Sequence, residues 1–379
     1  MADRQIARGV NMRNQITHRQ RFVSAVSRQK ADRAAFDLCG SPQTKIDYAR
    51  TRDALAACLG VEDPDHSRFG IDERVLEIFD IDTRPVGGMP TPATSHIRAE
   101  GGVRYDSYGI GYREVNGHFE ICHNPLRGCG VDEINAYTMP DAGDVDAALI
   151  RKWAGEAEKL HGETDYAIVA EHPVLGVFEL GCWMFGFEEY LYRLAADPEA
   201  VHAFSRRVLG YQKKVIDIYY GALGRHIDCT TSGDDFGTQA GLFMSVAMFK
   251  EFVAPYLKER VAHTRRHTDA FYQHHTCGSV YELIPCLAAC GVHVLNPIQP
   301  GTRKMEPERL KRDFGGIMSF WGGVDTQHLL TEGGPGDVRA EVGRLLGILG
   351  PEGYVLSPAH CIQPDVPAEN IAAIYTQHQ

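Results

Sequence analysis

Residues 271–278 read Phe-Tyr-Gln-His-His-Thr-Cys-Gly, and this stretch decides how the fold is interpreted. An aromatic, apolar run that ends at a glycine is typical of a barrel strand running out into a loop. Side chains two residues apart on an extended segment point the same way, so His275 and Cys277 can present an imidazole and a thiolate to one point. Alone, either residue is more often a core histidine or an inert buried thiol. Together at a strand end they favour a metal site.

A third candidate ligand lies 84 residues downstream, where Leu-Ser-Pro-Ala-His-Cys at 356–361 predicts another strand that ends in a thiol. Zn²⁺ accepts nitrogen and sulfur donors in a tetrahedron, and catalytic zinc sites keep three protein ligands with one position open. The sequence therefore predicts a catalytic zinc site made of His275, Cys277 and Cys361.

Eight stretches in all have the composition of buried strands, and they mostly alternate with amphipathic, helix-like segments. The expected strands are residues 34–39, 83–87, 166–171, 226–231, 270–275, 292–296, 317–321 and 354–357. The main expected helices are residues 145–160, 198–221, 245–267, 279–290, 307–313 and 336–349. Eight strands separated mostly by helices predict a single α/β domain, a (β/α)₈ TIM barrel over residues 1–379.

Two segments fall outside the barrel repeat. Thr17 can cap a helix that reaches about Gln29, which makes residues 1–33 an N-terminal helical extension. Residues 88–165, after the second strand, are too long for a plain helix, and Asn116-Gly117 between two alternating runs predicts a β-hairpin. Such a rim insertion can serve as a lid or as the arm of a homodimer, and the sequence does not decide between them.

Composition excludes several classes of partner. Lys and Arg number 39 against 50 Asp and Glu, a net charge of −11, which argues against nucleic acid and anionic lipid. No apolar run approaches membrane-spanning length, and residues 1–15 lack the apolar centre of a signal peptide. Ten scattered cysteines fit free thiols in a reducing cytosol, so we expect a cytoplasmic protein without membrane association.

Polar side chains gather where the expected strands end, which is where TIM barrels build active sites. We assign catalytic roles to Asp234, Asp235 and His360, and substrate-binding roles to Glu171, Asn296, Gln299 and Asp325. Either Asp234 or Asp235 could instead cap the helix that follows them in the sequence.

Several blocks together resemble the uroporphyrinogen decarboxylase superfamily and, within it, the zinc-dependent, corrinoid-linked methyltransferases. The blocks are Ser-Gly-Asp-Asp-Phe-Gly-Thr-Gln at 232–239, His-Thr-Cys-Gly at 275–278, Leu-Asn-Pro-Ile-Gln at 295–299, Phe-Trp-Gly-Gly-Val-Asp at 320–325, and Ser357-Pro358 with Cys361. The resemblance covers the chain from about Thr17. It implies a TIM barrel with zinc on His275, Cys277 and Cys361, and methyl transfer between a small molecule and a corrinoid.

Two features refine that expectation. The decarboxylase branch carries an arginine-bearing motif near the N-terminus for substrate carboxylates, and no arginine stands between Arg33 and Arg50. No Asp-x-His-x-x-Gly corrinoid motif occurs either, so a corrinoid would arrive on a separate protein. The expected methyl donor or acceptor is a small O-, N- or S-methyl compound or a thiol. A metal-free decarboxylase and a non-catalytic metal- or corrinoid-binding barrel remain as alternatives.

Overall fold

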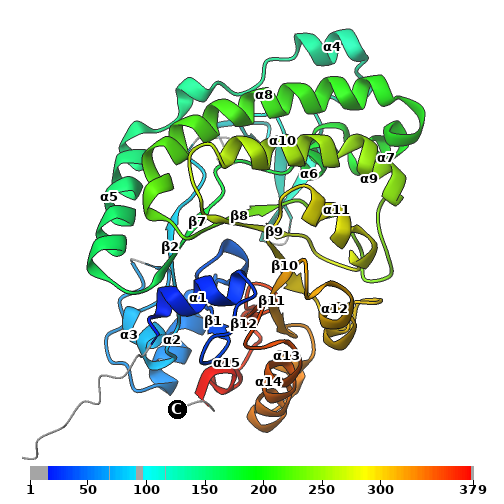
Figure 1. The fold of residues 1–379 in the computed structure, drawn as a ribbon. Helices are drawn as coiled ribbons and strands as arrows, with labels where there is room; N and C mark the ends of the chain where they lie inside the picture. Colours follow the sequence, from blue (N-terminus) through cyan, green and yellow to red (C-terminus); the bar gives the residue numbers. More distant parts are fainter. Residues whose placement is uncertain (1–15, 68, 91–96, 116, 377–379) are drawn as a thin grey trace, which may run out of the picture.

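The computed structural model describes residues 16–67, 69–90, 97–115 and 117–376, and its main sheet is an eight-stranded parallel barrel (Figure 1). The strand order is β1-β12-β11-β10-β9-β8-β7-β2. The strands are β1 (Ala35–Phe36), β2 (Thr83–Gly87), β7 (Ala167–Glu171), β8 (Cys229–Gly233), β9 (Phe271–His275), β10 (Val294–Ile298), β11 (Ser319–Val324) and β12 (Tyr354–Pro358). The predicted TIM barrel is confirmed.

Strands β1 and β2 close the barrel through Asp82 rather than through a regular ladder. The Asp82 N–H donates to the Phe36 carbonyl at 2.9 Å, and the Phe36 N–H donates to the Asp82 side chain at 2.7 Å. The buried Asp82 carboxylate also pairs with Arg21 and Arg33, each at 2.7 Å. A two-residue strand thus completes the barrel because one carboxylate supplies the missing pairing.

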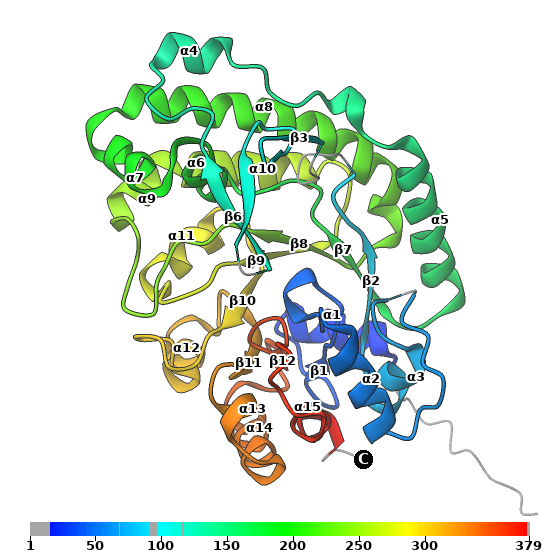
Figure 2. The same ribbon diagram turned by 180° about the vertical axis from the view of Figure 1, so that it is seen from behind.

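Helices cover the outside of the barrel, as Figures 1 and 2 show. They are α1 (His18–Val26), α2 (Ala49–Cys58), α3 (Glu73–Ile78), α4 (Val131–Ala136), α5 (Ala147–Glu163), α6 (Val177–Phe185), α7 (Phe187–Ala196), α8 (Pro198–Leu223), α9 (Val246–Phe252), α10 (Ala254–Thr264), α11 (Ile284–Ala289), α12 (Pro307–Phe314), α13 (Leu329–Glu332), α14 (Pro335–Leu349) and α15 (Ala368–Tyr375). Helices α5, α8 and α10 lie along the half of the barrel that contains β7 and β8.

Several predicted elements differ from the structure in their bounds; the strand expected over 34–39 is reduced to Ala35–Phe36, and the helix expected over 279–290 to Ile284–Ala289. Two further differences have a local reason. The helix expected over 245–267 is divided at Val253 into α9 and α10, because Pro255 has no N–H to continue the first helix. The strand expected from His226 begins only at Cys229, since His226 ends a 3-10 turn.

The expected N-terminal helix is α1, and it covers the amino-terminal end of the barrel. Thr17 and Gln20 form a capping box at its start. Phe22 and Val26 are fully buried in a cluster with Trp321, Val169 and other barrel-interior side chains. The carboxyl ends of the strands therefore form the open end of the barrel.

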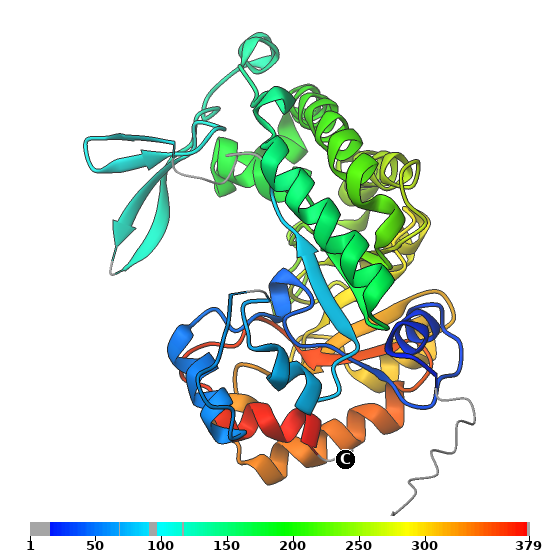
Figure 3. The ribbon, with the colours of Figure 1, turned by 90° about the vertical axis from the view of Figure 1, so that its left-hand side faces the viewer.

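The insertion after β2 forms a four-stranded antiparallel sheet, which we call the arm. Its strands, in spatial order, are β3 (Arg98–Glu100), β4 (Val103–Tyr105), β5 (Gly111–Val115) and β6 (His118–His123). Figure 3 shows the arm standing out from the barrel. The predicted hairpin is confirmed as the β5–β6 pair, although Asn116 lies outside the described residues.

Two further expectations can be compared with the structure. Within the described ranges, none of the helices has the length and apolar character needed to cross a membrane. All ten cysteines belong to those ranges and are unpaired thiols.

Candidate metal centre at the barrel mouth

His275 and Cys277 meet at the carboxyl end of β9. Cys277 Sγ lies 3.3 Å from His275 Nε2, as expected for alternate side chains leaving a strand. The other ring nitrogen, Nδ1, donates to Asn296 Oδ1 at 2.6 Å, and Asn296 is fully buried. This bond holds the proton on Nδ1, so Nε2 keeps its lone pair toward the cavity, as metal-binding histidines require. Asn296, predicted to bind substrate, therefore orients His275.

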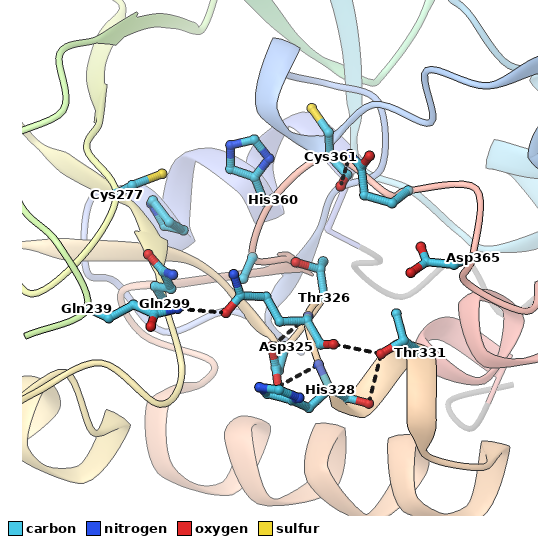
Figure 4. Close-up of a pocket in the computed structure, with 14 residues that line it drawn as sticks. Gln239, Cys277, Gln299, Asp325, Thr326, His328, Thr331, His360, Cys361 and Asp365 are labelled. Carbon is cyan, nitrogen blue, oxygen red and sulfur yellow. Dashed lines mark hydrogen bonds between the residues drawn. The ribbon is translucent and has the colours of Figure 1, made fainter. Parts of the chain in front are cut away.

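His360 joins this pair, whereas the Cys361 thiol does not. The ligand atoms of His275, Cys277 and His360 all lie within 4.8 Å of one another. The Cys361 thiol donates instead to the Pro42 carbonyl at 3.1 Å. Figure 4 shows the Cys277 sulfur directed toward the His360 ring, with Cys361 on the far side of that ring. In the structure the side chain that converges with the His-x-Cys pair is therefore His360, and the assignment of Cys361 as the third zinc ligand stays a prediction.

These donors fit zinc. Two imidazole nitrogens and a thiol are ligand types that zinc prefers, and Cys361 offers a second sulfur on the wall of the same cavity. Burial and the nearby Asp235 carboxylate raise the pKa of the Cys277 thiol well above its usual range. Burial also lowers the pKa of His275. The imidazole is therefore neutral, and the thiol needs a nearby cation to ionise. A zinc ion would supply that cation and could then bind both groups.

The adjacent carboxylates Asp234 and Asp235 have different roles. Asp235 Oδ1 accepts the Cys277 N–H at 2.7 Å and lies 3.9 Å from His275 Nε2, so it faces the candidate metal centre. Asp234 is buried and accepts the N–H groups of Phe178 (3.0 Å) and Glu179 (2.7 Å) at the start of α6. Asp234 is thus a helix cap, as the second interpretation of this pair held, although the helix it caps is α6 rather than the following one.

Glu179 is a functional candidate that the sequence analysis missed. It lies in the first turn of α6, where the Asp234 cap places its side chain beside Asp235, and it lines two cavities with that residue. Burial, together with Asp234 and Asp235, raises the pKa of Glu179 to about 8. The carboxyl is therefore protonated at neutral pH. Its isolated position in an apolar helix (Val-Phe-Glu-Leu-Gly-Cys) was the available sequence signal.

The remaining predicted residues surround the same mouth. Gln299 Oε1 accepts the Gly278 N–H at 2.7 Å and fixes the loop after Cys277. Asp325 accepts backbone N–H groups from Gln327 and Leu329 and caps α13, while its side chain borders the cavity. Glu171, at the end of β7, lies 3.4 Å from Lys45 Nζ.

Three adjoining cavities open around these groups. The first, of about 690 Å³, is lined by Cys277, Gln299, Asp325, His360 and Cys361 (Figure 4). A second, of about 360 Å³, is bordered by Glu171, Glu179, Asp235, His275 and His360. The third, of about 450 Å³, lies between α6 and the arm, and its wall includes Phe178, Trp183, Phe187, Phe243 and Ile121. Asp235 and Glu179 border both the second and the third.

The sequence comparison decides the family. Residues 163–377 match the family described as Uroporphyrinogen decarboxylase (URO-D), which spans the barrel from just before β7 to the C-terminal helix. The chain belongs to the uroporphyrinogen decarboxylase family. A search of curated proteins gave no match.

A solved methyltransferase structure supports the same fold. A methyltransferase from Methanosarcina mazei superposes with a TM-score of 0.67 at 15% sequence identity, over 95% of this chain and 97% of that one. A B12-independent methionine synthase from Shewanella sp. W3-18-1 gives a TM-score of 0.39 at 10% identity, covering 59% of this chain and 66% of its own. At 15% identity the likeness to the M. mazei protein concerns the fold, which the two share over nearly the full length.

Proposed function

We propose that this chain is a zinc-dependent methyltransferase that moves a methyl group between a small methylated compound and a corrinoid carried by a separate protein. The observation that carries the proposal is the His275–Cys277 donor pair, joined by His360 and flanked by Cys361, at the mouth of a uroporphyrinogen decarboxylase barrel. A pure decarboxylase has no evident use for that donor set.

His275 and Cys277 would hold the zinc ion, with the third ligand drawn from His360 or Cys361. When bound, zinc supplies a positive charge that draws electron density from the heteroatom carrying the methyl group, or stabilises an attacking thiolate. Asn296 keeps the His275 lone pair aimed at the metal position. Asp235 lies near the other ring nitrogen of His275, Nε2, and can orient the methylated substrate.

The leaving heteroatom needs a proton when it loses its methyl group to a corrinoid. Glu179 holds a proton at neutral pH and borders two cavities together with Asp235. We assign it the role of general acid, because its carboxyl is protonated at neutral pH and lines both of these cavities. Proton supply and methyl departure would then occur on one side of the mouth.

The two substrates would occupy different cavities. The third cavity has aromatic walls, and Arg127 lies at its margin, which suits the organic part of a small methylated donor. The larger first cavity is lined mainly by polar residue types and leaves room for a corrinoid face presented by another protein. In-line placement of donor carbon and acceptor supplies much of the rate in such a transfer.

The test is a cobalt spectrum. We expect the absorption of reduced cobalamin to change to that of methylcobalamin when the zinc-loaded protein and a methylated donor are added. The change should be absent with Cys277→Ala. Carbon dioxide release from a porphyrinogen by the metal-stripped protein, without methyl transfer, would overturn the proposal in favour of the decarboxylase.

A further inference from the structure

A second cluster of metal-ligating side chains lies on the outer surface of the barrel. Asp217 of α8 faces His263 of α10 and His267, three residues beyond the end of α10. Asp217 Oδ1 lies 2.6 Å from His263 Nε2 and 2.8 Å from His267 Nε2. These ligand atoms all lie within 4.8 Å of one another.

The alignment of two helices fixes this cluster. Lys213 of α8 pairs with Glu259 of α10 one turn earlier on both helices, and the Thr268 hydroxyl donates to the Gly224 carbonyl at 2.7 Å just beyond. The helices thus run side by side in register. His263 and His267 are four residues apart, and the turn continues because the His267 N–H donates to the Thr264 carbonyl at 3.0 Å. Both rings therefore occupy one face, as in helical zinc-binding histidine pairs.

The cluster is partly buried and partly open. The His263 side chain is 10% exposed, His267 24% and Asp217 50%. The His263 Nδ1 atom is buried without a hydrogen-bond partner, so the Nε2 edge carries the polar interactions of this ring. The intervening Arg265 is directed elsewhere, with its guanidinium 3.4 Å from His293. The open side at Asp217 leaves room for water as a further ligand.

We propose that Asp217, His263 and His267 form a second metal site, free of thiols, for a divalent transition metal such as zinc, cobalt or nickel. Two imidazoles and one carboxylate are donors that these ions accept, whereas Mg²⁺ and Ca²⁺ prefer oxygen ligands alone. Ligand atoms about 2.1 Å from a tetrahedral ion stand about 3.4 Å apart, so the half-exposed Asp217 carboxylate has to withdraw by roughly 0.6–0.8 Å from the two imidazoles.

The site has a structural consequence for the strand that carries the first metal centre. His267 lies four residues before Phe271, where β9 begins, and β9 ends at His275. A metal ion at the cluster joins α8 to the segment that enters β9 from the amino-terminal end of the barrel. It therefore holds the far end of the same strand whose carboxyl end presents His275 and Cys277.

Cobalt titration of the full-length protein tests the proposal, because Co²⁺ reports its own ligands. We expect about two equivalents of Co²⁺ to bind. One should show the intense sulfur-to-cobalt charge-transfer absorption of a thiolate site, and the other only ligand-field bands. His267→Gln should lose the equivalent without charge transfer and keep the other.

His66→Gln is the matched control. His66 Nε2 pairs with Asp53 Oδ1 at 3.0 Å, a His–Asp pair on the surface that has no second imidazole. This variant should bind two equivalents, like the parent protein. Far-UV circular dichroism establishes that each variant is folded before titration.

A thermal measurement gives an independent readout. Excess Zn²⁺ should raise the melting temperature of the parent protein and of His66→Gln by a few degrees more than that of His267→Gln, because ligands that bind only the native state stabilise it. A single thiolate-type equivalent in the parent protein would overturn the second site. So would a second equivalent that survives His267→Gln.

Discussion

The proposed reaction requires that the Glu179 carboxyl carry a proton. Its raised pKa, about 8, means that the protonated form is present below that pH and is lost as the pH rises through it. We predict that methyl transfer declines above about pH 8 in the parent protein. Glu179→Gln keeps the shape but cannot donate the proton, so it should be slower at pH 7 by about 100-fold and lack this decline. Rates measured across pH 6–9 check both expectations.

A stability measurement on the same variant distinguishes a loss of catalysis from a loss of folding. Urea unfolding of Glu179→Gln should show no loss of stability, since a neutral amide replaces a neutral carboxyl. A variant with the parent pH profile and rate would exclude Glu179 as the acid.

Cys361 and His360 compete for the third zinc position. His360 lies with His275 and Cys277, whereas the Cys361 thiol donates a weak sulfur–carbonyl hydrogen bond to Pro42 and also contacts Lys45 and Asp47. A second thiolate would neutralise Zn²⁺ fully, so we predict that Cys361 turns to bind it. Cys361→Ala should weaken zinc binding by more than about 100-fold, the upper end of the loss when a ligand's supporting partner is removed.

Competition with a zinc chelator measures this affinity. His360→Ala is the paired variant and should retain zinc within about tenfold of the parent protein. The reverse order, with zinc lost from His360→Ala and kept by Cys361→Ala, would assign the third position to His360.

At the scale of elements, the contact between β8 and α6 organises one side of the mouth. Gly176 precedes α6, and a Cβ atom there would lie 2.2 Å from Asp234 Cγ. We predict that Gly176→Ala destabilises the protein by about 1–3 kcal/mol, because it forces the capping carboxylate away from the α6 amides. Activity should fall as well, since the cap positions Glu179.

Gly210→Ala is the control for that substitution. Gly210 lies in α8, and a Cβ atom there would meet nothing within 4 Å. Alanine should stabilise this exposed helix position by about 0.5–1 kcal/mol. Chemical denaturation of both variants provides the comparison, and equal stabilities would contradict the role of the α6 cap.

The accuracy of the sequence-based prediction depended on whether an element's signal was local. The strand predicted over residues 166–171 agrees with β7 to within one residue, because its apolar run Ala-Ile-Val-Ala is continuous in sequence. Strands β3 and β4 were not predicted, since these short, exposed strands have no apolar pattern and are set by pairing within the arm.

In the candidate site, too, the arrangement could be predicted where its signal is local in sequence. His275 and Cys277 are two residues apart, and strand geometry alone brings their ligand atoms together. The direction of the Cys361 thiol depends on Pro42, 319 positions away in the chain, which no local pattern reveals. Glu179 reaches the mouth only because Asp234, 55 positions away, holds the start of its helix.

At the scale of the whole molecule, the barrel matches a structure from M. mazei over nearly its full length, while the arm and the cavity beneath it are features of the rim. The exposed apolar side chains Phe119 and Ile121 of β6, 43% and 37% exposed, belong to this rim. Barrel enzymes acquire specificity in such loops while the strands keep the site in place.

The Asp82 closure has a consequence for the motions of the native state. Because β1 meets β2 mainly through the backbone and side chain of Asp82 rather than through a continuous ladder, the barrel should open transiently at this seam before it unfolds elsewhere. In Asp82→Asn we predict that deuterium replaces the Phe36 amide proton much faster, while exchange at Leu295, in the middle of β10, changes less. Hydrogen–deuterium exchange resolved by peptide can follow both. Equal acceleration of exchange at Phe36 and Leu295 would instead mean that the barrel exposes both amides only by unfolding as one unit.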